Sequence, residues 1–279
     1  MRHLSTVLLT MLPALPLLES AAQPTADKSY RLVWSDEFET DGRPDPGKWR
    51  FESGFVRNQE LQYYQPENAS CRRGLLVIEA RREEVPNARY ARASSDWRQK
   101  RRTASYTSAC LTTRGIRHWK YARIEVRARI DARDGLWPAI WTVGESGPWP
   151  DCGEIDIMEF YNGHILANAC WSSGAPWKPR WSSVRKPLAD FGGSDWASRF
   201  HTWRMDWDRQ HVRLYVDDVL LNSISADEVA KPAGQAIGSF DQPHCLLLNL
   251  AVGGTNGGDP SNTAFPATFE VDFVRVFQR

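Results

Sequence analysis

Short segments in which apolar and polar residues alternate fill the chain from about Tyr30 onward, and Gly, Pro, Asn and Asp separate them. The clearest is 123–130, where every even position is apolar and every odd position is charged. Successive side chains of a strand point to opposite faces, so this segment predicts a strand with one buried and one solvated face. Similar alternation predicts strands at 75–80, 204–207, 212–216 and 269–277. The pattern therefore predicts an all-β protein of antiparallel strands.

The alternating segments continue to the C-terminus without an internal repeat or a linker, which predicts one domain over residues 23–279. Two stretches lack the alternation and are predicted to be surface loops: the Arg-rich 83–105 and the Trp- and Ser-rich 172–198. Residues 1–22 differ, because a basic pair precedes a short apolar run that ends in small residues. This order predicts a signal peptide, and we therefore expect a secreted or periplasmic protein.

Composition narrows the classes of function. The 279 residues include 35 Lys and Arg against 34 Asp and Glu, a net charge of +1. A nearly neutral chain has no global field that attracts a polyanion, and Glu83, Glu84 and Asp96 dilute the cations of 83–105, so we expect no nucleic-acid partner. No segment after residue 22 has the roughly 20 apolar residues that span a bilayer, and we expect a monomer that binds no membrane.

The five cysteines are odd in number and widely spaced, so at least one thiol is unpaired, and the sequence does not fix which of them pair. They form no C-x-x-C motif, and the six His residues are scattered. We expect most of these cysteines to be small buried apolar residues rather than metal ligands.

Three acids alternate with large apolar residues in the segment 153–160. On a strand, Glu154 and Asp156 point to one face, whereas a regular strand would send Glu159, five positions after Glu154, to the other. One extra residue near Ile157 and Met158, a β-bulge, would return Glu159 to the acidic face. Burying isolated acids is unfavourable, so three on one face predict a water-filled groove. An exposed edge strand protected by its charges is the alternative.

Indoles surround these acids: Trp137 and Trp141 lie four positions apart, hence on one face of a strand, and Trp149 follows. Core packing explains one of them, whereas stacking on sugar rings explains their grouping with acids. Two carboxyls that flank a glycosidic bond at about 5 to 5.5 Å perform retaining hydrolysis. We assign Glu154 as the nucleophile, Asp156 as its helper and Glu159 as the acid and base, because its surroundings should make Glu159 hold its proton longer.

With these acids, the chain resembles glycoside hydrolase family 16, whose bulged members carry E-[IV]-D-x-x-E on a concave face. The similarity covers nearly all of the mature chain in the same order. Its blocks are WSDEF at 34–38, NQELQYY at 58–64, YTSA at 106–109, GLWPA at 135–139, FHTW at 200–203, NLAVGG at 249–254 and VDFVRV at 271–276. The wording around the acids is most similar to that of laminarinase-type endo-β-1,3-glucanases.

The resemblance implies a concanavalin-like β-jelly-roll sandwich of two curved antiparallel sheets with a concave substrate groove. It places the nucleophile at Glu154, the helper at Asp156 and the acid/base at Glu159. The implied sugar-binding residues are Asn58, Trp137 and Trp141. We add Trp149, beside the acids, and Asn249, in the NLAVGG block, as further candidate sugar-binding residues. Many members hold a structural Ca²⁺ away from the groove, and Glu37 and Asp272 match its acidic ligand positions. No cofactor is implied for catalysis.

Two positions depart from the laminarinase pattern. The double glycine 253–254 is followed by Thr255 rather than by a Trp soon after it, and the strand after the acids reads ANACW at 167–171 without the usual His. We expect Trp171 to replace the missing stacking position.

These observations predict an endo-acting, retaining hydrolase of laminarin-like β-1,3-glucan or mixed-linkage β-1,3/1,4-glucan. A galactan hydrolase of the agarase or carrageenase kind is the first alternative, since those enzymes share the bulged motif. A non-catalytic β-glucan-binding protein is the second, although all three acids are present. The polysaccharide is thus the expected partner.

Overall fold

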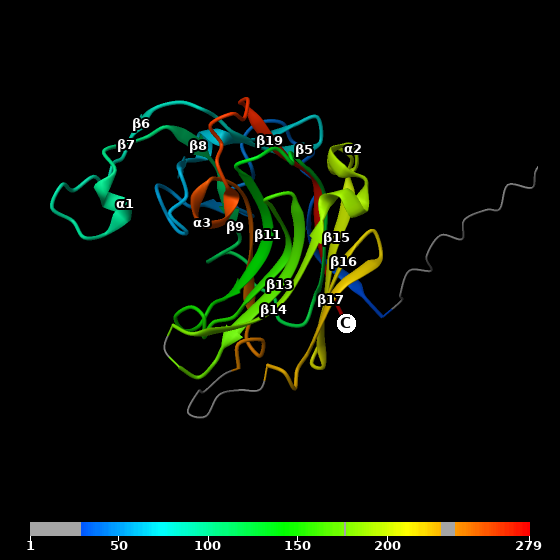
Figure 1. Cartoon of the computed structure of the whole chain (residues 1–279). Helices are drawn as coiled ribbons and strands as arrows, with labels where there is room; N and C mark the ends of the chain where they lie inside the picture. Colours follow the sequence, from blue (N-terminus) through cyan, green and yellow to red (C-terminus); the bar gives the residue numbers. More distant parts are fainter. Residues whose placement is uncertain (1–28, 176, 230–237) are drawn as a thin grey trace, which may run out of the picture.

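Two antiparallel sheets stack face to face in the computed structural model, which describes residues 29–175, 177–229 and 238–279 (Figure 1). The outer sheet contains, in spatial order, β17 (Val219–Ser225), β16 (His211–Val216), β15 (His201–Trp207), β10 (Arg123–Ile130), β19 (Ala267–Gln278), β5 (Leu75–Ala80) and β4 (Ala69–Arg72), with β1 (Arg31–Asp36) also paired to β19. The groove sheet contains β14 (Pro179–Pro187), β13 (His164–Ser172), β12 (Glu154–Tyr161), β11 (Leu136–Gly144), β18 (His244–Val252), β9 (Cys110–Thr112) and β2 (Arg50–Phe51).

Smaller elements decorate this sandwich. Strands β3 (Gln62–Tyr64) and β8 (Tyr106–Ser108) form a parallel pair, and β6 (Val85–Pro86) pairs with β7 (Thr103–Ala104). The helices are single turns: η1 (Pro66–Asn68), α1 (Trp97–Lys100), η2 (Leu188–Phe191), α2 (Gly193–Ala197) and α3 (Gly254–Gly257). No described helix is long and apolar enough to cross a bilayer. The predicted signal peptide, residues 1–22, lies outside the described residues.

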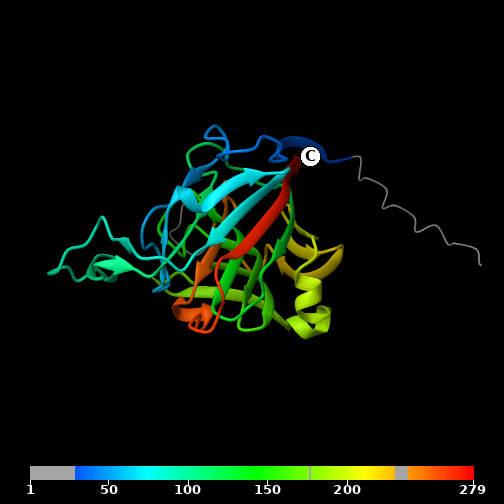
Figure 2. The same cartoon turned by 90° about the horizontal axis from the view of Figure 1, so that it is seen from above.

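The predicted all-β sandwich is confirmed, and two predicted strands, 75–80 and 123–130, coincide with β5 and β10. The prediction of a loop over 172–198 is wrong, because it contains β14. This strand pairs only with β13 and is mostly exposed, so it needs no apolar alternation and its sequence resembles a loop. The segment 83–105 likewise holds β6, β7 and α1, and Figure 2 shows it standing away from the sandwich.

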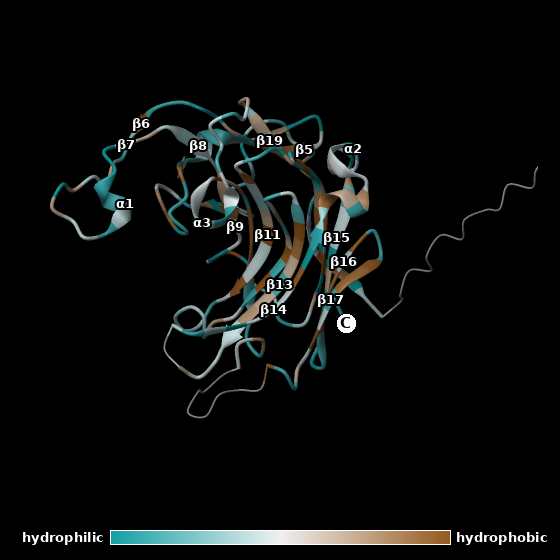
Figure 3. Cartoon of the chain, in the orientation of Figure 1, coloured by the Kyte–Doolittle hydropathy of each residue, from teal (hydrophilic) through white to brown (hydrophobic). Residues whose placement is uncertain are grey.

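The core lies between the two sheets. Even-numbered residues of β10, such as Ile124 and Val126, meet Ile155, Ile157 and Phe160 of β12 in one apolar cluster. Figure 3 shows hydrophobic residues, drawn in brown, concentrated in the strands of the sandwich. Each fully buried aliphatic or aromatic side chain contributes roughly 1.5 to 3 kcal/mol, so this layer holds the curvature of the groove sheet.

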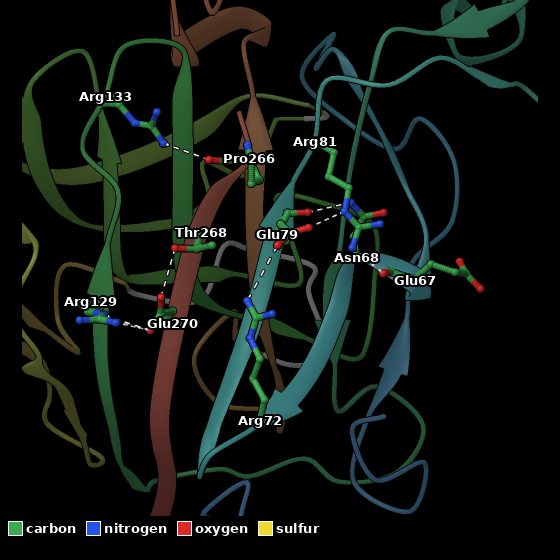
Figure 4. A network of polar contacts seen from close by, with 10 residues as sticks. All are labelled: Glu67, Asn68, Arg72, Glu79, Arg81, Arg129, Arg133, Pro266, Thr268 and Glu270. Atoms are coloured by element: carbon green, nitrogen blue, oxygen red, sulfur yellow. Dashed lines mark hydrogen bonds and ion pairs between the residues drawn. The ribbon is translucent and has the colours of Figure 1, made fainter. Parts of the chain in front are cut away.

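The other face of the outer sheet carries opposite charges on neighbouring strands (Figure 4). Glu79 of β5 accepts a hydrogen bond from Arg81, which directly follows the same strand, with 2.5 Å between Nε and Oε1, and it lies 3.9 Å from Arg72 of the neighbouring β4. Glu270 of β19 accepts a hydrogen bond from Arg129 of the neighbouring β10 at 2.6 Å. Exposed pairs of this kind contribute about 0 to 1 kcal/mol each. They therefore add less to stability than the apolar layer behind them.

Candidate active site

A β-bulge in β12 brings the three acids together. Between the cross-strand pairs Asp156 with Asn168 and Glu159 with Leu166, β12 has one residue more than β13. The extra residue turns Glu159 back to the face of Glu154 and Asp156, and all three line the same groove. The bulge predicted from the spacing of the acids is confirmed.

The groove crosses the concave sheet and has a volume of about 890 Å³, in the range of ligand-binding sites. Its lining runs from the edge strand β14 across β13, β12, β11 and β18 to the segment that follows β2. The side chains that matter below are Arg57, Asn58, Glu60, Arg114, Trp137, Trp141, Trp149, Glu154, Asp156, Glu159, Asn168, Trp181 and Asn249.

Side-chain N–H groups hold both glutamates. The indole of Trp137 donates to Glu159 Oε1 at 2.8 Å, and Asn168 Nδ2 donates to Glu159 Oε2 at 3.0 Å. The indole of Trp149 donates to Glu154 Oε2 at 3.1 Å. Hydrogen bonds to an ionised carboxylate are directional, so they fix where each carboxylate points.

Burial raises the pKa of each of the three carboxyls, and repulsion among them raises the pKa values of Glu154 and Asp156 further. The pKa of Glu154 rises to about 7, because burial and the charge of Glu159 both disfavour its ionised form. Burial and the charges of both glutamates raise the pKa of Asp156 well above its ordinary value. Close carboxyls with raised pKa values share protons, as expected for an acid beside a nucleophile.

The surroundings of Glu159 raise its pKa overall. Burial raises its pKa, yet the hydrogen bonds from Trp137 and Asn168 favour its ionised form and lower the pKa. The prediction that its surroundings make Glu159 hold its proton longer is borne out in direction, since the net effect raises the pKa. The indole of Trp137 acts against this effect, because it turns its N–H to the carboxylate. A sugar chain over the groove would remove water and favour the neutral acid.

Trp137, Trp141 and Trp149 all line the groove, as the sequence predicts. Trp137 and Trp141 are nearly buried, and the indole of Trp141 donates to Asn249 Oδ1 at 2.7 Å. Trp149 is 37% exposed at the rim. Trp149 is therefore the most open of the three for stacking on a sugar ring.

The prediction for Trp171 is wrong. Its indole is buried between the sheets and packs edge-on against Phe240, with 6.1 Å between ring centroids. The residue before it, Cys170, pairs with Glu154 across the strands, so Trp171 points to the opposite face. Sequence reasoning instead missed Trp181 of β14, which lines the groove and is 45% exposed.

The segment between β2 and β3 supplies Asn58, which donates to Glu60 at 3.3 Å. Its carbonyl oxygen accepts from the backbone of Thr255, which ties this segment to α3. Gly254 has a φ of +76°, and a Cβ there would lie 2.7 Å from the carbonyl oxygen of Asn58. Only glycine fits this crossing, so the double glycine positions Asn58 and Glu60.

Sequence reasoning also missed further polar residues of the groove, among them Arg57, Glu60, Arg114 and Asn168. Arg57 forms a salt bridge with Glu52 and lies over the ring of Trp141, with 5.0 Å from Cζ to the centroid. A polar residue inside the apolar run 165–171 was the available signal for Asn168, whereas Arg57 and Glu60 lie in a loop without period.

Glu37 and Asp272 do not fit a calcium site. Arg275 binds Glu37 through two hydrogen bonds of 3.0 and 2.8 Å, and Arg127 forms a salt bridge with Asp272. Among the described residues, no three Asp, Glu, His or Cys side chains gather as metal ligands do. The arginines already supply the positive charge that a cation would bring.

All five cysteines are free and buried, as predicted for small apolar residues.

Comparisons with known proteins find relatives in the glycoside hydrolase family that the three acids indicate. Residues 68–275 match the model of glycosyl hydrolases family 16. The β-glucanase of Rhodothermus marinus is 38% identical over 269 residues, which cover 89% of this chain and 85% of that protein.

Two solved structures share the fold. The laminarinase catalytic domain of Thermotoga maritima superposes with a TM-score of 0.73 at 37% identity, over 90% of this chain and 99% of that one. A structure reported for endo-acting O-glycanases of human gut bacteria, which initiate mucin breakdown, reaches a TM-score of 0.83 at 32% identity, over 92% of this chain and 94% of that one. The family match over most of the chain, the sandwich and the bulged acid strand together show that this chain belongs to glycosyl hydrolase family 16.

Proposed function

We propose that the chain is an endo-acting, retaining glycoside hydrolase of β-1,3-glucan, as in laminarin, or of mixed-linkage β-1,3/1,4-glucan. The observation that carries the proposal is the bulge of β12, which puts Glu154, Asp156 and Glu159 in one groove. A groove across the width of a sheet accommodates the middle of a polysaccharide, which suits internal cleavage. Of the relatives named above, the β-glucanase of Rhodothermus marinus and the laminarinase of Thermotoga maritima act on β-glucans.

In the first step, the Glu154 carboxylate attacks the anomeric carbon while Glu159 donates a proton to the departing glycosidic oxygen. This forms a glycosyl ester on Glu154 and releases the chain beyond the cleaved bond. In the second step, Glu159 removes a proton from water, which attacks the same carbon and restores Glu154 with net retention. Asp156 takes up the proton shared with Glu154 as the charge on Glu154 changes.

Replacing Glu154 by Gln tests the proposal. The amide keeps the shape of the side chain but cannot form the ester, so we expect reducing-sugar release from laminarin to fall at least about a thousandfold while laminari-oligosaccharides still bind. The exposed Glu39→Gln variant, with the same chemical change away from the groove, should keep full activity. Unchanged turnover in Glu154→Gln would refute the assignment, and a parent protein that binds without turnover would instead be a glucan-binding protein.

A second candidate function has an observation in its favour. The O-glycanase structure fits this chain with a higher TM-score than the laminarinase, 0.83 against 0.73. An endo-acting galactan or O-glycan hydrolase with the same three acids is therefore the alternative. Digestion of laminarin, lichenan, agarose, carrageenan and mucin O-glycans in parallel separates the two, and cleavage only of the last three would replace our choice.

We further propose that the enzyme acts as a monomer outside the cell or in the periplasm, where polysaccharides are met. The apolar run within 1–22 supports export. The proposal needs no cofactor for the chemistry, since the three acids supply nucleophile, acid and base.

A further inference from the structure

A basic hairpin beside the groove has no part in the proposed chemistry. The arm, residues 83–105, contains six Lys or Arg against three Asp or Glu, a local charge of +3 in a chain of +1. Its exposed cations are Arg89, Arg92, Arg98, Lys100 and Arg102, and Glu84 is its one exposed acid. Like charges this close repel one another, so their gathering lowers stability unless a partner neutralises them.

The arm is a folded element that holds these cations in place. Asn87 is buried, and its Nδ2 donates to the carbonyl oxygens of Arg98 and Arg101, both at 2.8 Å. Asp96 caps α1 by accepting from the backbone of Arg98, and it also neutralises the Arg98 side chain. No salt bridge joins Arg89, Arg92, Lys100 or Arg102 to a carboxylate within the described residues.

The base of the arm adjoins the groove. Arg101 donates to the carbonyl oxygens of Glu60 and Gln59 at 2.6 and 3.1 Å, and its guanidinium lies over Phe55 and Trp97. Figure 1 shows α1, β6 and β7 projecting on the side of the sandwich that the groove sheet forms. The arm therefore stands beyond the end of the groove where β9 and β2 lie.

One more exposed cation lines the groove near this end. Arg114 follows β9, is exposed and lines the groove, and among the described residues no carboxylate pairs with it. The opposite end differs, because there the exposed Trp181 of the edge strand β14 lines the wall. A chain in the groove thus passes from an exposed indole to an end where Arg57 is neutralised by Glu52 and Arg114 is a cation without a salt bridge among the described residues.

We propose that the arm and Arg114 bind the sulfate or carboxylate groups of an acidic polysaccharide whose chain extends past the β9 and β2 end of the groove. Spaced cations on a rigid hairpin match the regular anionic groups of such a chain, and their long side chains contact it through salt bridges. The inference rests on the proposed polysaccharide hydrolase. Because laminarin and mixed-linkage glucan are uncharged, it adds an acidic polysaccharide as a further ligand.

The test uses Glu154→Gln, which leaves the polymer uncut, in native gels cast with laminarin or with laminarin sulfate. In this background, the arm variant Arg89→Gln, Arg92→Gln, Lys100→Gln and Arg102→Gln removes four charges. The control variant Arg31→Gln, Arg73→Gln, Lys186→Gln and Arg199→Gln removes four exposed charges elsewhere. Both lose the same net charge, so a difference in retardation reports binding.

We expect the parent to bind laminarin sulfate about tenfold more tightly than laminarin, and the arm variant to lose that preference while the control variant keeps it. Added salt near 0.5 M should abolish the preference, since it shortens the Debye length to about 4 Å. The melting temperature of the arm variant should not fall, because like charges have been removed.

An arm variant that keeps the parent's preference would overturn the inference, as would a parent that binds both polymers equally or binds single-stranded DNA as tightly as laminarin sulfate. A failure of this inference can be distinguished from a failure of the proposed function. Retardation by neutral laminarin reports the groove, and hydrolysis of laminarin by the protein with Glu154 intact reports the proposed function. A protein that cleaves laminarin and fails the sulfate comparison therefore remains a glucanase without an acidic-chain site.

Discussion

Hydrogen-bond donors decide how each acid of the groove works. Glu154 receives one indole N–H from Trp149, whereas Glu159 receives an indole N–H from Trp137 and an amide N–H from Asn168. A donor favours the ionised carboxylate and so lowers its pKa, against the effect of burial. The amide of Asn168 can also turn to offer its oxygen, which is buried without a partner, to a protonated Glu159.

Replacing Asn168 by Ala should change the pH dependence of the enzyme. The variant loses one hydrogen bond to ionised Glu159, worth roughly 1.5 kcal/mol, so the pKa of Glu159 rises by about one unit. Since Glu159 must be protonated for the first step, the alkaline limb of the kcat/KM profile should move about one unit to higher pH. A pH profile on laminarin measures this.

Trp181→Phe is the matched control for that profile, because Trp181 lines the same groove but donates no described hydrogen bond to the acids. Its alkaline limb should stay in place. An Asn168→Ala profile that coincides with the parent's would mean that this amide does not set the ionisation of Glu159.

At the scale of elements, the crossing between α3 and the segment before β3 determines the position of Asn58. Gly254 and Gly74 have nearly the same φ, +76° and +74°, but a Cβ at Gly74 meets nothing within 4 Å. The two sites therefore separate the effect of backbone strain from the effect of the close contact.

Gly74→Ala should lower the free energy of unfolding by about 1 kcal/mol through strain alone. Gly254→Ala adds a clash with the Asn58 carbonyl and should lower it by about 1 to 3 kcal/mol more, and it should raise KM by displacing Asn58 and Glu60. Urea unfolding and steady-state kinetics measure the two effects. Equal stability losses and an unchanged KM would contradict the role given to this crossing.

Strands with one wet face could be predicted from the sequence, and so could the bulge, because the unequal spacing of Glu154, Asp156 and Glu159 requires it for a shared face. The face of the sheet to which each indole points could not be predicted from the sequence. Trp171 lies in the core and Trp181 in the groove because Cys170 pairs with both Glu154 and Trp181, which makes these three residues share a face. Such pairing depends on register between strands, and period two alone gives no register.

For the whole molecule, the buried acids link stability to pH. Their pKa values are raised on folding, so the stability they provide is complete below their unfolded pKa of about 4 and is lost as pH rises through their folded values. For Glu154 that loss extends to about pH 7, and for Asp156 it extends well above the ordinary pKa of an aspartate. Activity thus depends on a site that destabilises the sandwich at neutral and alkaline pH.

Asp156→Asn should therefore stabilise the fold while it lowers activity. Without the third charge, the melting temperature at pH 8 should rise by a few degrees, and the gain should shrink towards pH 4. Calorimetry across this range measures it. Asp195→Asn, an exposed acid of α2, should show no such pH-dependent gain, and the same flat response in Asp156→Asn would contradict the linkage.

Both catalytic glutamates belong to the single strand β12, whereas the residues proposed to touch sugar come from five or more separate segments. When thermal motion shifts neighbouring strands of the sheet relative to one another, the set of contacts with the polysaccharide changes. The spacing along one covalent backbone hardly changes. Thermal motion or a flexing groove should thus loosen the grip on the chain well before it misaligns the pair of acids.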